Sequence, residues 1–405
     1  MTVQEIRNQF PALASKVYGK PLVYLDNAAS SQRPLSVIAE WTKLVEMGNA
    51  NIHRAVHHLA GVATEAYEST RDFIAEYLNA SSREEIVFTY GTTSGINLVA
   101  FSFGEAFVEE GDEIVVSTAE HHSNIVPWQM LCERKKAVLK VLDIEENGEL
   151  DLDQLPQLLT ARTKLVAVTH ISNVLGIVNP IQEIVRICHS KGIPVLVDGA
   201  QGIVHQKVDV RALDCDFYAF SGHKVYAATG TGVLYGKRKW LDQMPPYMGG
   251  GEMIETVRFS GTTYAPLPEK FEAGTQNFNA VPTLVPALKM HQSFSEIIDY
   301  QNNILDFCYK ELTGDPRIVL YGTPVNPADK IPVFSFAVKG VHHEDLALIL
   351  DKMGIALRSG QMCAEPLMDR LGVTGLLRAS FAPYNTLKEA QYFIESLHKA
   401  VNMLL

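Results

Sequence analysis

The stretch Phe217-Tyr218-Ala219-Phe220-Ser221-Gly222-His223-Lys224 joins a short apolar run to a hydroxyl, an imidazole and an amine. A run of this length and character is typical of a buried strand, so the polar tetrapeptide is expected directly at the strand's end. The Lys224 amine would then have the position and chemistry to hold an aldehyde cofactor as a Schiff base. The tetrapeptide by itself also fits an ordinary solvated lysine, so other segments must supply partners.

Short strand-like runs between residues 84 and 236 alternate with segments long enough for helices. The runs are Glu85 to Phe88, Glu113 to Ser117, Val138 to Leu142, Lys164 to Thr169, Pro194 to Val197, Phe217 to Phe220 and Gly232 to Tyr235. The alternation predicts an α/β fold with a mostly parallel sheet covered on both faces. Ligands bind at the carboxyl ends of such strands, and His121, Asn173, Asp198 and Lys224 each follow a predicted strand.

The remaining chain predicts a second, smaller α+β domain. Gly249-Gly250-Gly251 and the stretch Ser260 to Pro268 are expected to be loop, and helical patterns with strands near Pro332 to Val338 and Leu376 to Ser380 follow. We therefore divide the chain into three parts. Residues 1–20 would pack with the small domain, 21–265 would form the large ligand-binding domain, and 266–405 would form the small domain that carries Cys363.

Composition and charge exclude several classes of partner. The 405 residues are 47% hydrophobic and 20% charged, with a net charge of −11, and no basic cluster is longer than Arg134-Lys135-Lys136. Nucleic acid and anionic membranes are therefore poor partners. The amino terminus lacks the apolar core of a signal peptide, and no stretch is apolar for long enough to span a bilayer, so we expect a soluble cytoplasmic protein.

The 5 cysteines are irregularly spaced and form no Cys-x-x-Cys pair, which argues against a disulfide scaffold or a thiolate zinc site. Cys132, Cys188 and Cys308 fall in helical patterns and Cys215 precedes a strand, so these four are expected to be buried small hydrophobes. Cys363 lies near Gly360 in a polar segment, which indicates an accessible loop.

Two segments have both a binding and a purely structural interpretation. Asp198 follows a buried strand, where its carboxylate could pair with a protonated pyridine nitrogen, or cap a helix, or join a structural ion pair. Gly91-Thr92-Thr93 precedes a helical pattern, where small residues and hydroxyls suit a phosphate. Simple helix capping by Thr92 or Thr93 explains the same residues equally well.

The run Glu120-His121-His122-Ser123-Asn124 brings a histidine to the end of a strand. Its ring could lie on an aromatic cofactor or transfer protons. The paired histidines also look like half of a metal site, but adjacent side chains point in different directions and no His-x-x-x-His pattern or nearby cysteine completes it. We therefore expect no metal.

These segments together resemble the pyridoxal-phosphate (PLP) cysteine desulfurases of the class-V aminotransferase family, in the group II branch of Suf and Csd desulfurases. The similarity runs almost end to end and implies a fold-type I PLP-dependent transferase. The matching segments, in family order, are Tyr24-Leu25-Asp26-Asn27-Ala28-Ala29, Gly91-Thr92-Thr93, Glu120-His121-His122, Val197-Asp198-Gly199-Ala200-Gln201, Ser221-Gly222-His223-Lys224, Phe271-Glu272-Ala273-Gly274-Thr275 and Arg358-Ser359-Gly360-Gln361-Met362-Cys363-Ala364.

The resemblance implies a role for each matching residue. Those expected to hold PLP are Lys224 (Schiff base), Asp198 (ring nitrogen), His121 (stacking on the ring), Gln201 (phenolic oxygen), Thr92, Thr93, Ser221 and His223 (phosphate), and Thr275 (phosphate, from the other subunit of a homodimer). Asn173 and Arg378 would receive the substrate carboxylate, because the guanidinium fork binds carboxylate at two points, and Arg358 would line the same site.

The implied reaction converts L-cysteine to L-alanine and leaves a persulfide on Cys363, which supplies sulfur for iron–sulfur cluster assembly or a related transfer. Lys224 would remove the α-proton while Asp198 keeps the ring nitrogen protonated, and His121 or Lys224 would return a proton. Only the thiolate form of Cys363 would attack the substrate sulfur. A separate sulfur-acceptor protein, whose identity the sequence does not reveal, would take the persulfide sulfur.

The chain departs from the family pattern at two places. Ala227-Ala228 replaces a Gly-Pro pair after the lysine, and Met362 replaces a frequent histidine before the cysteine. Alternative activities on the same site are selenocysteine lyase and cysteine-sulfinate desulfinase, and a plain aminotransferase is a further possibility that would have no use for the Cys363 loop. An alternative of another class is an inactive scaffold that binds sulfur carriers, against which intact Lys224, Asp198 and Cys363 argue.

Overall fold

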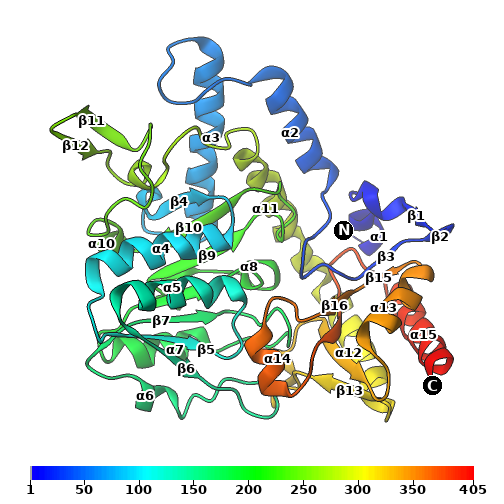
Figure 1. Cartoon of the computed structure of the whole chain (residues 1–405). Coiled ribbons are helices and arrows are strands. Elements are labelled where there is room, and N and C mark those ends of the chain that lie inside the picture. Colours follow the sequence, from blue (N-terminus) through cyan, green and yellow to red (C-terminus); the bar gives the residue numbers. More distant parts are fainter. Residues whose placement is uncertain (1) are drawn as a thin grey trace.

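The computed structural model describes residues 2–405, apart from the side chains of Glu296 and Ile298. A seven-stranded sheet in the order β4-β10-β9-β8-β7-β5-β6 dominates the first two thirds of the chain (Figure 1). Its strands are β4 (Ile86–Thr89), β5 (Glu113–Ser117), β6 (Val138–Leu142), β7 (Thr163–Thr169), β8 (Val195–Asp198), β9 (Phe217–Ser221) and β10 (Gly232–Gly236). Only β10 runs antiparallel to its neighbours. The predicted α/β fold class, with a mostly parallel sheet, is confirmed.

Helices cover both faces of this sheet, because successive side chains of a strand point to opposite faces. Along β5, for example, Ile114 and Val116 pack with α4 and α5, whereas Val115 packs on the face that α3 and α7 cover. The helices of this region are α2 (Leu35–Met47), α3 (His58–Tyr77), α4 (Thr92–Phe107), α5 (Val126–Lys135), α6 (Leu155–Leu158), α7 (Ile181–His189), α8 (Gly202–His205), α9 (Val210–Leu213) and α10 (Arg238–Leu241). The strands at the centre of the sheet are therefore mostly apolar, which is why their positions could be predicted.

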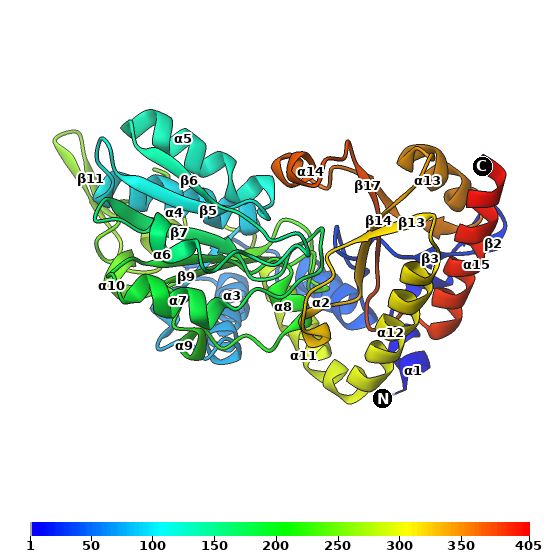
Figure 2. The ribbon, with the colours of Figure 1, turned by 90° about the horizontal axis from the view of Figure 1, so that it is seen from below.

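A second, antiparallel sheet in the order β13-β14-β17-β16 lies beside the first domain (Figure 2). Its strands are β13 (Ile318–Tyr321), β14 (Val333–Val338), β16 (Arg358–Gly360) and β17 (Leu376–Ser380), and the helices packed around it are α12 (Ile298–Gly314), α13 (His343–Lys352) and α15 (Leu387–Leu404). The remaining helices of this part of the chain are α11 (Leu284–Ser293), which packs against α2 and α3, and α14 (Glu365–Leu371). Leu377 and Ala379 of β17 pack against the helices. Arg378, between them, points to the other face and donates to the carbonyl of Asn173 in the large domain.

The amino-terminal segment contacts the small domain. It contains α1 (Val3–Arg7), β1 (Lys16–Val17), β2 (Lys20–Pro21) and β3 (Val23–Tyr24), and β3 pairs in parallel with β15 (Ile355–Ala356). Arg7 Nη2 also lies 2.9 Å from Glu389 Oε1 of α15. Within residues 2–405, no helix combines the length and the apolar character that a membrane crossing requires.

One sequence prediction is wrong. The stretch Ser260 to Pro268, expected to be loop, contains β12 (Gly261–Tyr264), which pairs with β11 (Ile254–Arg258) in a hairpin that projects from the large domain (Figure 1). All four residues of β12 are exposed. A strand with no buried face shows no alternation of apolar and polar residues, so the usual signal for a strand was missing.

Candidate active site

A cavity of about 520 Å³ lies where the carboxyl ends of the large sheet meet the small domain. It is lined by almost all of the predicted site residues, namely Thr92, Thr93, His121, Asn173, Asp198, Ser221, His223, Lys224, Arg358, Cys363 and Arg378. Ala28, Ala29, His122, Ser123, Ala200, Ser359, Gln361 and Met362 complete the lining. The fold thus brings residues more than 200 positions apart in the sequence to the wall of the same cavity.

Lys224 and Asp198 both line this cavity, Asp198 buried and Lys224 half-buried, and the charge of each affects the pKa of the other. Burial lowers the pKa of the Lys224 amine, and the nearby Asp198 carboxylate partly offsets this effect. Burial likewise raises the pKa of Asp198, which the Lys224 charge and the Ala200 N–H oppose. The contact with Ala200, 2.9 Å long, is to a turn residue, so Asp198 neither caps a helix nor joins a conventional surface ion pair. Because water has little access to either group, each is suited to pair with a polar or charged group of a bound ligand.

The amino terminus of α4 is shaped by Gly91, whose φ of +142° belongs to the range that favours glycine. Gly91 is the N-cap and no side chain caps the helix, so the alternative interpretation, helix capping by Thr92 or Thr93, does not hold. Instead, the Thr92 N–H donates to Ser221 Oγ over 2.8 Å, and the two hydroxyls lie 2.7 Å apart. The first N–H groups of a helix have no helical acceptor, so this end suits an anion.

His121 is held in one tautomer. Its Nδ1 accepts the backbone N–H of Ser123 over 3.0 Å, so in the neutral ring the proton resides on Nε2. Burial lowers the pKa of His121 to about 3, so the ring is uncharged near neutral pH. Behind it, burial raises the pKa of Glu120 to about 8, and this side chain accepts from Asn124 Nδ2 and from the Thr169 N–H. Glu120 thereby joins the ends of β5 and β7.

Three charged side chains meet on the small-domain side. Asp26 Oδ1 lies 3.2 Å from Arg378 Nη2, and Asp26 Oδ2 lies 2.8 Å from Arg358 Nη2. Arg378 is buried and its Nε has no hydrogen-bond partner within the described part of the chain. An unpaired buried N–H is costly, so this atom invites an acceptor from a ligand. Asp26 was not among the predicted site residues, although it too follows a strand.

The Cys363 thiol is exposed on a loop with unusual backbone geometry. Met362 and Cys363 have φ values of +51° and +55°, a range that non-glycine residues occupy rarely. Asn173 Nδ2 donates to the Met362 carbonyl over 3.0 Å, and the His122 N–H donates to the Cys363 carbonyl over 2.7 Å. The loop is therefore attached to the large domain on either side of the peptide bond between Met362 and Cys363.

Two predicted residues lie outside the cavity lining. Gln201 is buried beside it, where its Nε2 donates to the Ala28 carbonyl over 2.7 Å. Thr275 is exposed on a loop that follows Glu272, and Glu272 is anchored by Arg71 at 2.7 Å. The role predicted for Thr275 belongs to the cavity of a neighbouring subunit, so its position outside the cavity of its own chain does not test that role.

The Ala227-Ala228 departure has a structural explanation. The Ala228 N–H donates to Thr283 Oγ1 over 3.1 Å, and the Ala227 N–H donates to the Gly222 carbonyl over 2.9 Å. A proline at 228 would lack that donor. The segment after Lys224 is thus held by hydrogen bonds to Thr283 and Gly222.

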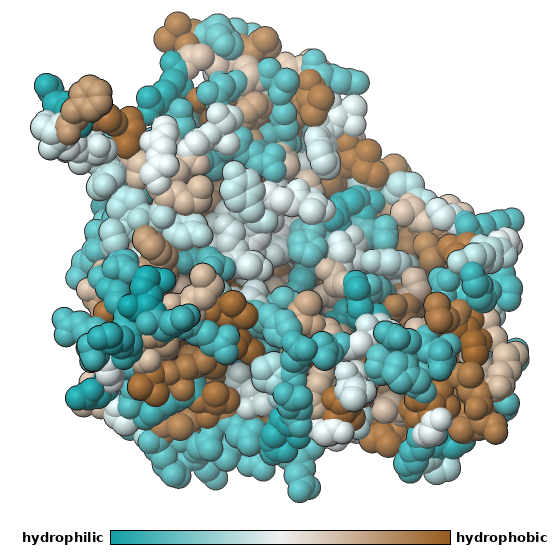
Figure 3. All heavy atoms as spheres, in the orientation of Figure 1, coloured by the Kyte–Doolittle hydropathy of each residue, from teal (hydrophilic) through white to brown (hydrophobic). Residues whose placement is uncertain are grey.

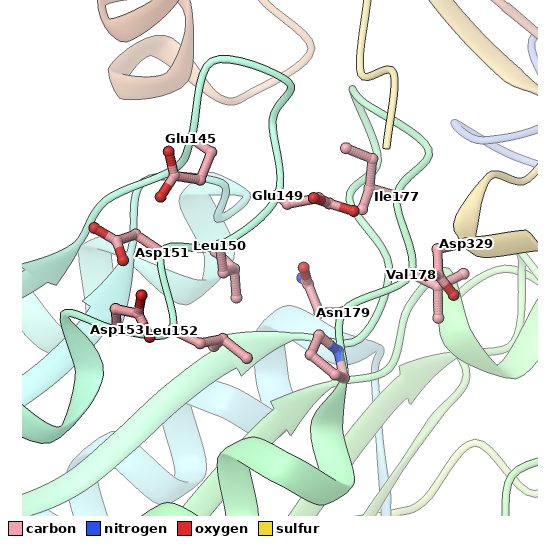
Figure 4. Close-up of a pocket in the computed structure, with 11 residues that line it drawn as sticks. Glu145, Glu149, Leu150, Asp151, Leu152, Asp153, Ile177, Val178, Asn179 and Asp329 are labelled. Carbon is pink, nitrogen blue, oxygen red and sulfur yellow. The ribbon is translucent and has the colours of Figure 1, made fainter. Parts of the chain in front are cut away.

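A second cavity, of about 370 Å³, opens away from the first and is lined by residues of the large domain together with Asp329 of the small one (Figure 4). It is lined by the carboxylates of Glu145, Glu149, Asp151, Asp153 and Asp329, with apolar residues between them. This negative charge repels a phosphate or an amino-acid carboxylate. Within residues 2–405, no group of three or more His, Cys, Asp or Glu side chains is arranged to hold a metal ion.

Comparison with known proteins gives matches over the full chain. A family model described as aminotransferase class-V matches residues 23–393. The cysteine desulfurase of Cronobacter sakazakii is 46% identical over 406 residues, which cover 100% of this chain and 99% of the relative. A probable cysteine desulfurase of Vibrio cholerae is 45% identical over 406 residues, with 100% of each chain covered.

Solved structures agree. The crystal structure of the cysteine desulfurase CsdA (S-sulfonic acid) from Escherichia coli matches with a TM-score of 0.90 and 38% identity over 100% of both chains. The apo structure of a cysteine desulfurase from Thermococcus onnurineus NA1 matches with a TM-score of 0.91 and 36% identity, covering 98% of this chain and 99% of the other.

The chain therefore belongs to the class-V aminotransferase family, whose members depend on PLP. Within that family, its full-length relatives carry the name cysteine desulfurase. The resemblance predicted from the motifs is confirmed, together with the cofactor that it implied.

Proposed function

We propose that this protein is a cysteine desulfurase that converts L-cysteine to L-alanine and collects the sulfur as a persulfide on Cys363. The observation that carries the proposal is one cavity lined by a half-buried amine, a buried carboxylate, a buried arginine and an exposed thiol: Lys224, Asp198, Arg378 and Cys363. A plain aminotransferase has no need of the thiol. The activity also agrees with the names of the full-length relatives.

The residues present fit PLP. The Lys224 amine would meet the aldehyde carbon, the buried Asp198 carboxylate would meet the ring nitrogen, and His121 would lie on the ring. Thr92, Thr93, Ser221 and His223 surround the start of α4, where a phosphate is favoured. Gln201, fixed by the Ala28 carbonyl, would reach the phenolic oxygen. When bound, PLP withdraws electrons from the bonds around the substrate α-carbon.

Arg378 and Asn173 would bind the substrate carboxylate. Asp26 holds one edge of the Arg378 guanidinium at 3.2 Å, and the Asn173 carbonyl accepts from Nη1 at 2.9 Å, which leaves Nε for the substrate. Arg358, exposed and also paired with Asp26, would add positive charge at the entrance. A planar guanidinium held in one orientation selects an α-carboxylate.

Lys224 would act as the general base. An amine with a lowered pKa is more readily neutral, and a neutral amine can take the substrate α-proton. The neutral His121 ring presents Nε2–H, so it can donate a hydrogen bond but cannot accept a proton at that nitrogen. Proton removal is therefore assigned to Lys224, which in its protonated form can also return a proton.

The sulfur step uses the Cys363 thiolate. Its sulfur bonds to the substrate sulfur while the bond from that sulfur to Cβ breaks, and the electron pair stays on carbon. Protonation of that carbon gives alanine, and Cys363 is left as a persulfide. No external oxidant is consumed, because the carbon is reduced as the two sulfur atoms are joined.

A homodimer is supported by an unpaired apolar surface. One face of α2 exposes Leu35, Ile38, Trp41 and Val45, each between 42% and 48% exposed, while Val37 and Leu44 are buried beneath. Hydrophobic residues emerge among polar ones over these upper helices and on the projecting hairpin (Figure 3). Thr275 does not line its own chain's cavity, which agrees with a role in the phosphate site of a second subunit.

The exposed Cys363 would pass its sulfur to an acceptor protein for iron–sulfur cluster assembly or a related pathway. Four other cysteines are free and buried, which suits a reducing cytoplasm. We retain the division into residues 1–20, 21–265 and 266–405.

The test is to assay alanine and sulfide from L-cysteine with the variant Cys363→Ala. We expect loss of sulfur release with retention of the visible absorbance of bound PLP, and Cys132→Ala, a buried cysteine far from the cavity lining, should behave like the parent. Normal turnover of L-cysteine by Cys363→Ala would disprove the role of the thiol. Faster turnover of L-selenocysteine or cysteine sulfinate than of L-cysteine by the parent would favour the alternative activities.

A further inference from the structure

His122 contacts the Cys363 segment with both its backbone and its side chain. Its N–H donates to the Cys363 carbonyl over 2.7 Å, and its Nε2 accepts the N–H of Glu365 over 3.0 Å. His122 begins the short 3₁₀ helix η3 (His122–Asn124) beyond β5, whereas Glu365 is the first residue of α14. In Figure 2, α14 lies between α5 and α13, at the side of the small domain that faces the large one. The two hydrogen bonds thus connect the domains at Cys363.

The backbone of this segment needs such support. Two successive non-glycine residues, Met362 and Cys363, occupy the left-handed region, which is energetically unfavourable for residues with a side chain. Such conformations persist only when surrounding contacts hold them. Asn173 holds the carbonyl of Met362, and His122 holds the next carbonyl and the amide two residues further on. Of these three hydrogen bonds, only the one from the Glu365 N–H to the His122 side chain lies at the end of the loop where α14 begins.

The Glu365 N–H can only donate, so His122 Nε2, which accepts this hydrogen bond, carries no proton. In the neutral ring the proton therefore lies on Nδ1. His121 has the opposite tautomer, because its Nδ1 receives Ser123 N–H. The two neighbouring histidines are therefore committed to different tasks. His121 turns an N–H toward the cavity, and His122 uses its free nitrogen to hold the loop.

We propose that His122 is a positioning residue for the sulfur step, which fixes the Cys363 thiolate where it can attack the substrate sulfur. This inference rests on the proposed function. The proposed role predicts different effects on two substrates, L-cysteine and cysteine sulfinate. L-Cysteine requires the Cys363 nucleophile, whereas cysteine sulfinate can lose its sulfur as SO₂, the electron pair of the broken C–S bond remaining on carbon, without any thiolate. Loosening the loop should therefore slow only the first reaction.

The experiment compares three substitutions in the full-length, PLP-loaded enzyme. In His122→Gln the side-chain oxygen falls near the position of Nε2 and can still accept from Glu365 N–H; in His122→Asn it falls near Nδ1 and cannot; His122→Ala has no acceptor. We expect His122→Asn and His122→Ala to lower kcat for L-cysteine between about 10- and 100-fold. Their kcat for cysteine sulfinate should stay within about twofold, and His122→Gln should recover most of the loss.

Hydrogen exchange at the Glu365 amide gives a readout that does not depend on activity. The amide should be protected in the parent and in His122→Gln, and should exchange faster in His122→Asn and His122→Ala because its acceptor is gone. Glu365→Ala is the matched control. It removes the carboxylate that lies 3.8 Å from His122 Nε2 but keeps the backbone N–H, so it should match the parent in both assays.

Two results would overturn the inference: an unchanged ratio of cysteine to sulfinate turnover in His122→Asn and His122→Ala, or an equal fall of that ratio in His122→Gln. If His122→Ala fails to fold, the Gln and Asn pair decides the question. Failure of the proposed function itself would look different, since Cys363→Ala would then turn over L-cysteine normally.

Discussion

Arg378 and Asp26 are paired across the boundary between β17 and the segment after β3, with Nη2 and Oδ1 3.2 Å apart. The pair leaves Arg378 Nε without a partner in the described part of the chain, in a buried position on the cavity wall. Asp26 thus orients the guanidinium and neutralises part of its charge, while the free edge faces the space that a substrate carboxylate would occupy.

Arg378→Lys tests this arrangement. Lysine keeps the positive charge but lacks the planar fork that can contact Asp26, the Asn173 carbonyl and a substrate at once. We expect KM for L-cysteine to rise about tenfold or more, equivalent to at least about 1.4 kcal/mol of binding, with a smaller change in kcat. Steady-state kinetics measure both constants. Arg370→Lys, a control at a half-exposed arginine paired with Asp143, should leave KM unchanged.

Asp198→Asn removes a negative charge with little change of shape. A neutral amide cannot balance a protonated ring nitrogen, so kcat should fall about 10²- to 10³-fold, the usual cost of removing one preorganised charge. The bound cofactor should still be visible by absorbance, because Lys224 and the phosphate site are intact. A kcat within about threefold of the parent would show that Asp198 does not serve the ring.

The buried Lys330 should make the stability of the fold depend on pH. Its amine is buried, donates to the Leu175 carbonyl at 2.5 Å, and burial lowers its pKa from 10.5 to about 7. Between these two values the unfolded chain binds a proton that the folded chain does not, so the residue lowers stability by its full amount below about pH 7 and by less as pH rises toward 10.5.

Lys330→Met removes that titration. The free energy of unfolding of the parent minus that of the variant should increase with pH between 7 and 10, by at most about 1.4 kcal/mol per pH unit, as measured by urea unfolding. Lys339→Met is the control, since Lys339 also donates to a carbonyl, that of Pro316, but is exposed. A difference that does not vary with pH would mean that Lys330 stays charged in the fold.

The buried pair of Arg71 and Glu272 should stabilise the loop that carries Thr275. Arg71 Nη1 lies 2.7 Å from Glu272 Oε1, and Glu272 also accepts the N–H of Phe88 in β4. Arg71→Met leaves a buried carboxylate unpaired, so the free energy of unfolding should fall by about 3–5 kcal/mol. Arg71→Met combined with Glu272→Gln should recover part of this loss, and strict additivity of the two single changes would contradict the coupling.

The sheet and the ends of its strands were predictable because both follow from local rules. The run Phe217 to Phe220 is apolar at every position because helices cover both faces, and the polar residues that come next lie at the ligand-binding edge. The observed bounds of β5, β6 and β17 equal the predicted ones. The hairpin of β11 and β12 was missed because burial, the source of the periodic signal, is absent there.

The sequence by itself therefore determined the α/β class, the family and the set of polar residues that could form a site. Only the tertiary structure decided how these residues are paired. Asp26 and Arg378 are 352 positions apart, and His122 and Glu365 are 243 apart, so no local pattern relates them. The tautomer of His121 is set locally by the Ser123 N–H, whereas the tautomer of His122, the free edge of Arg378 and the strained Cys363 loop all depend on contacts between segments far apart in the sequence. Such contacts arise from packing over long sequence separations, which local propensity and periodicity do not encode.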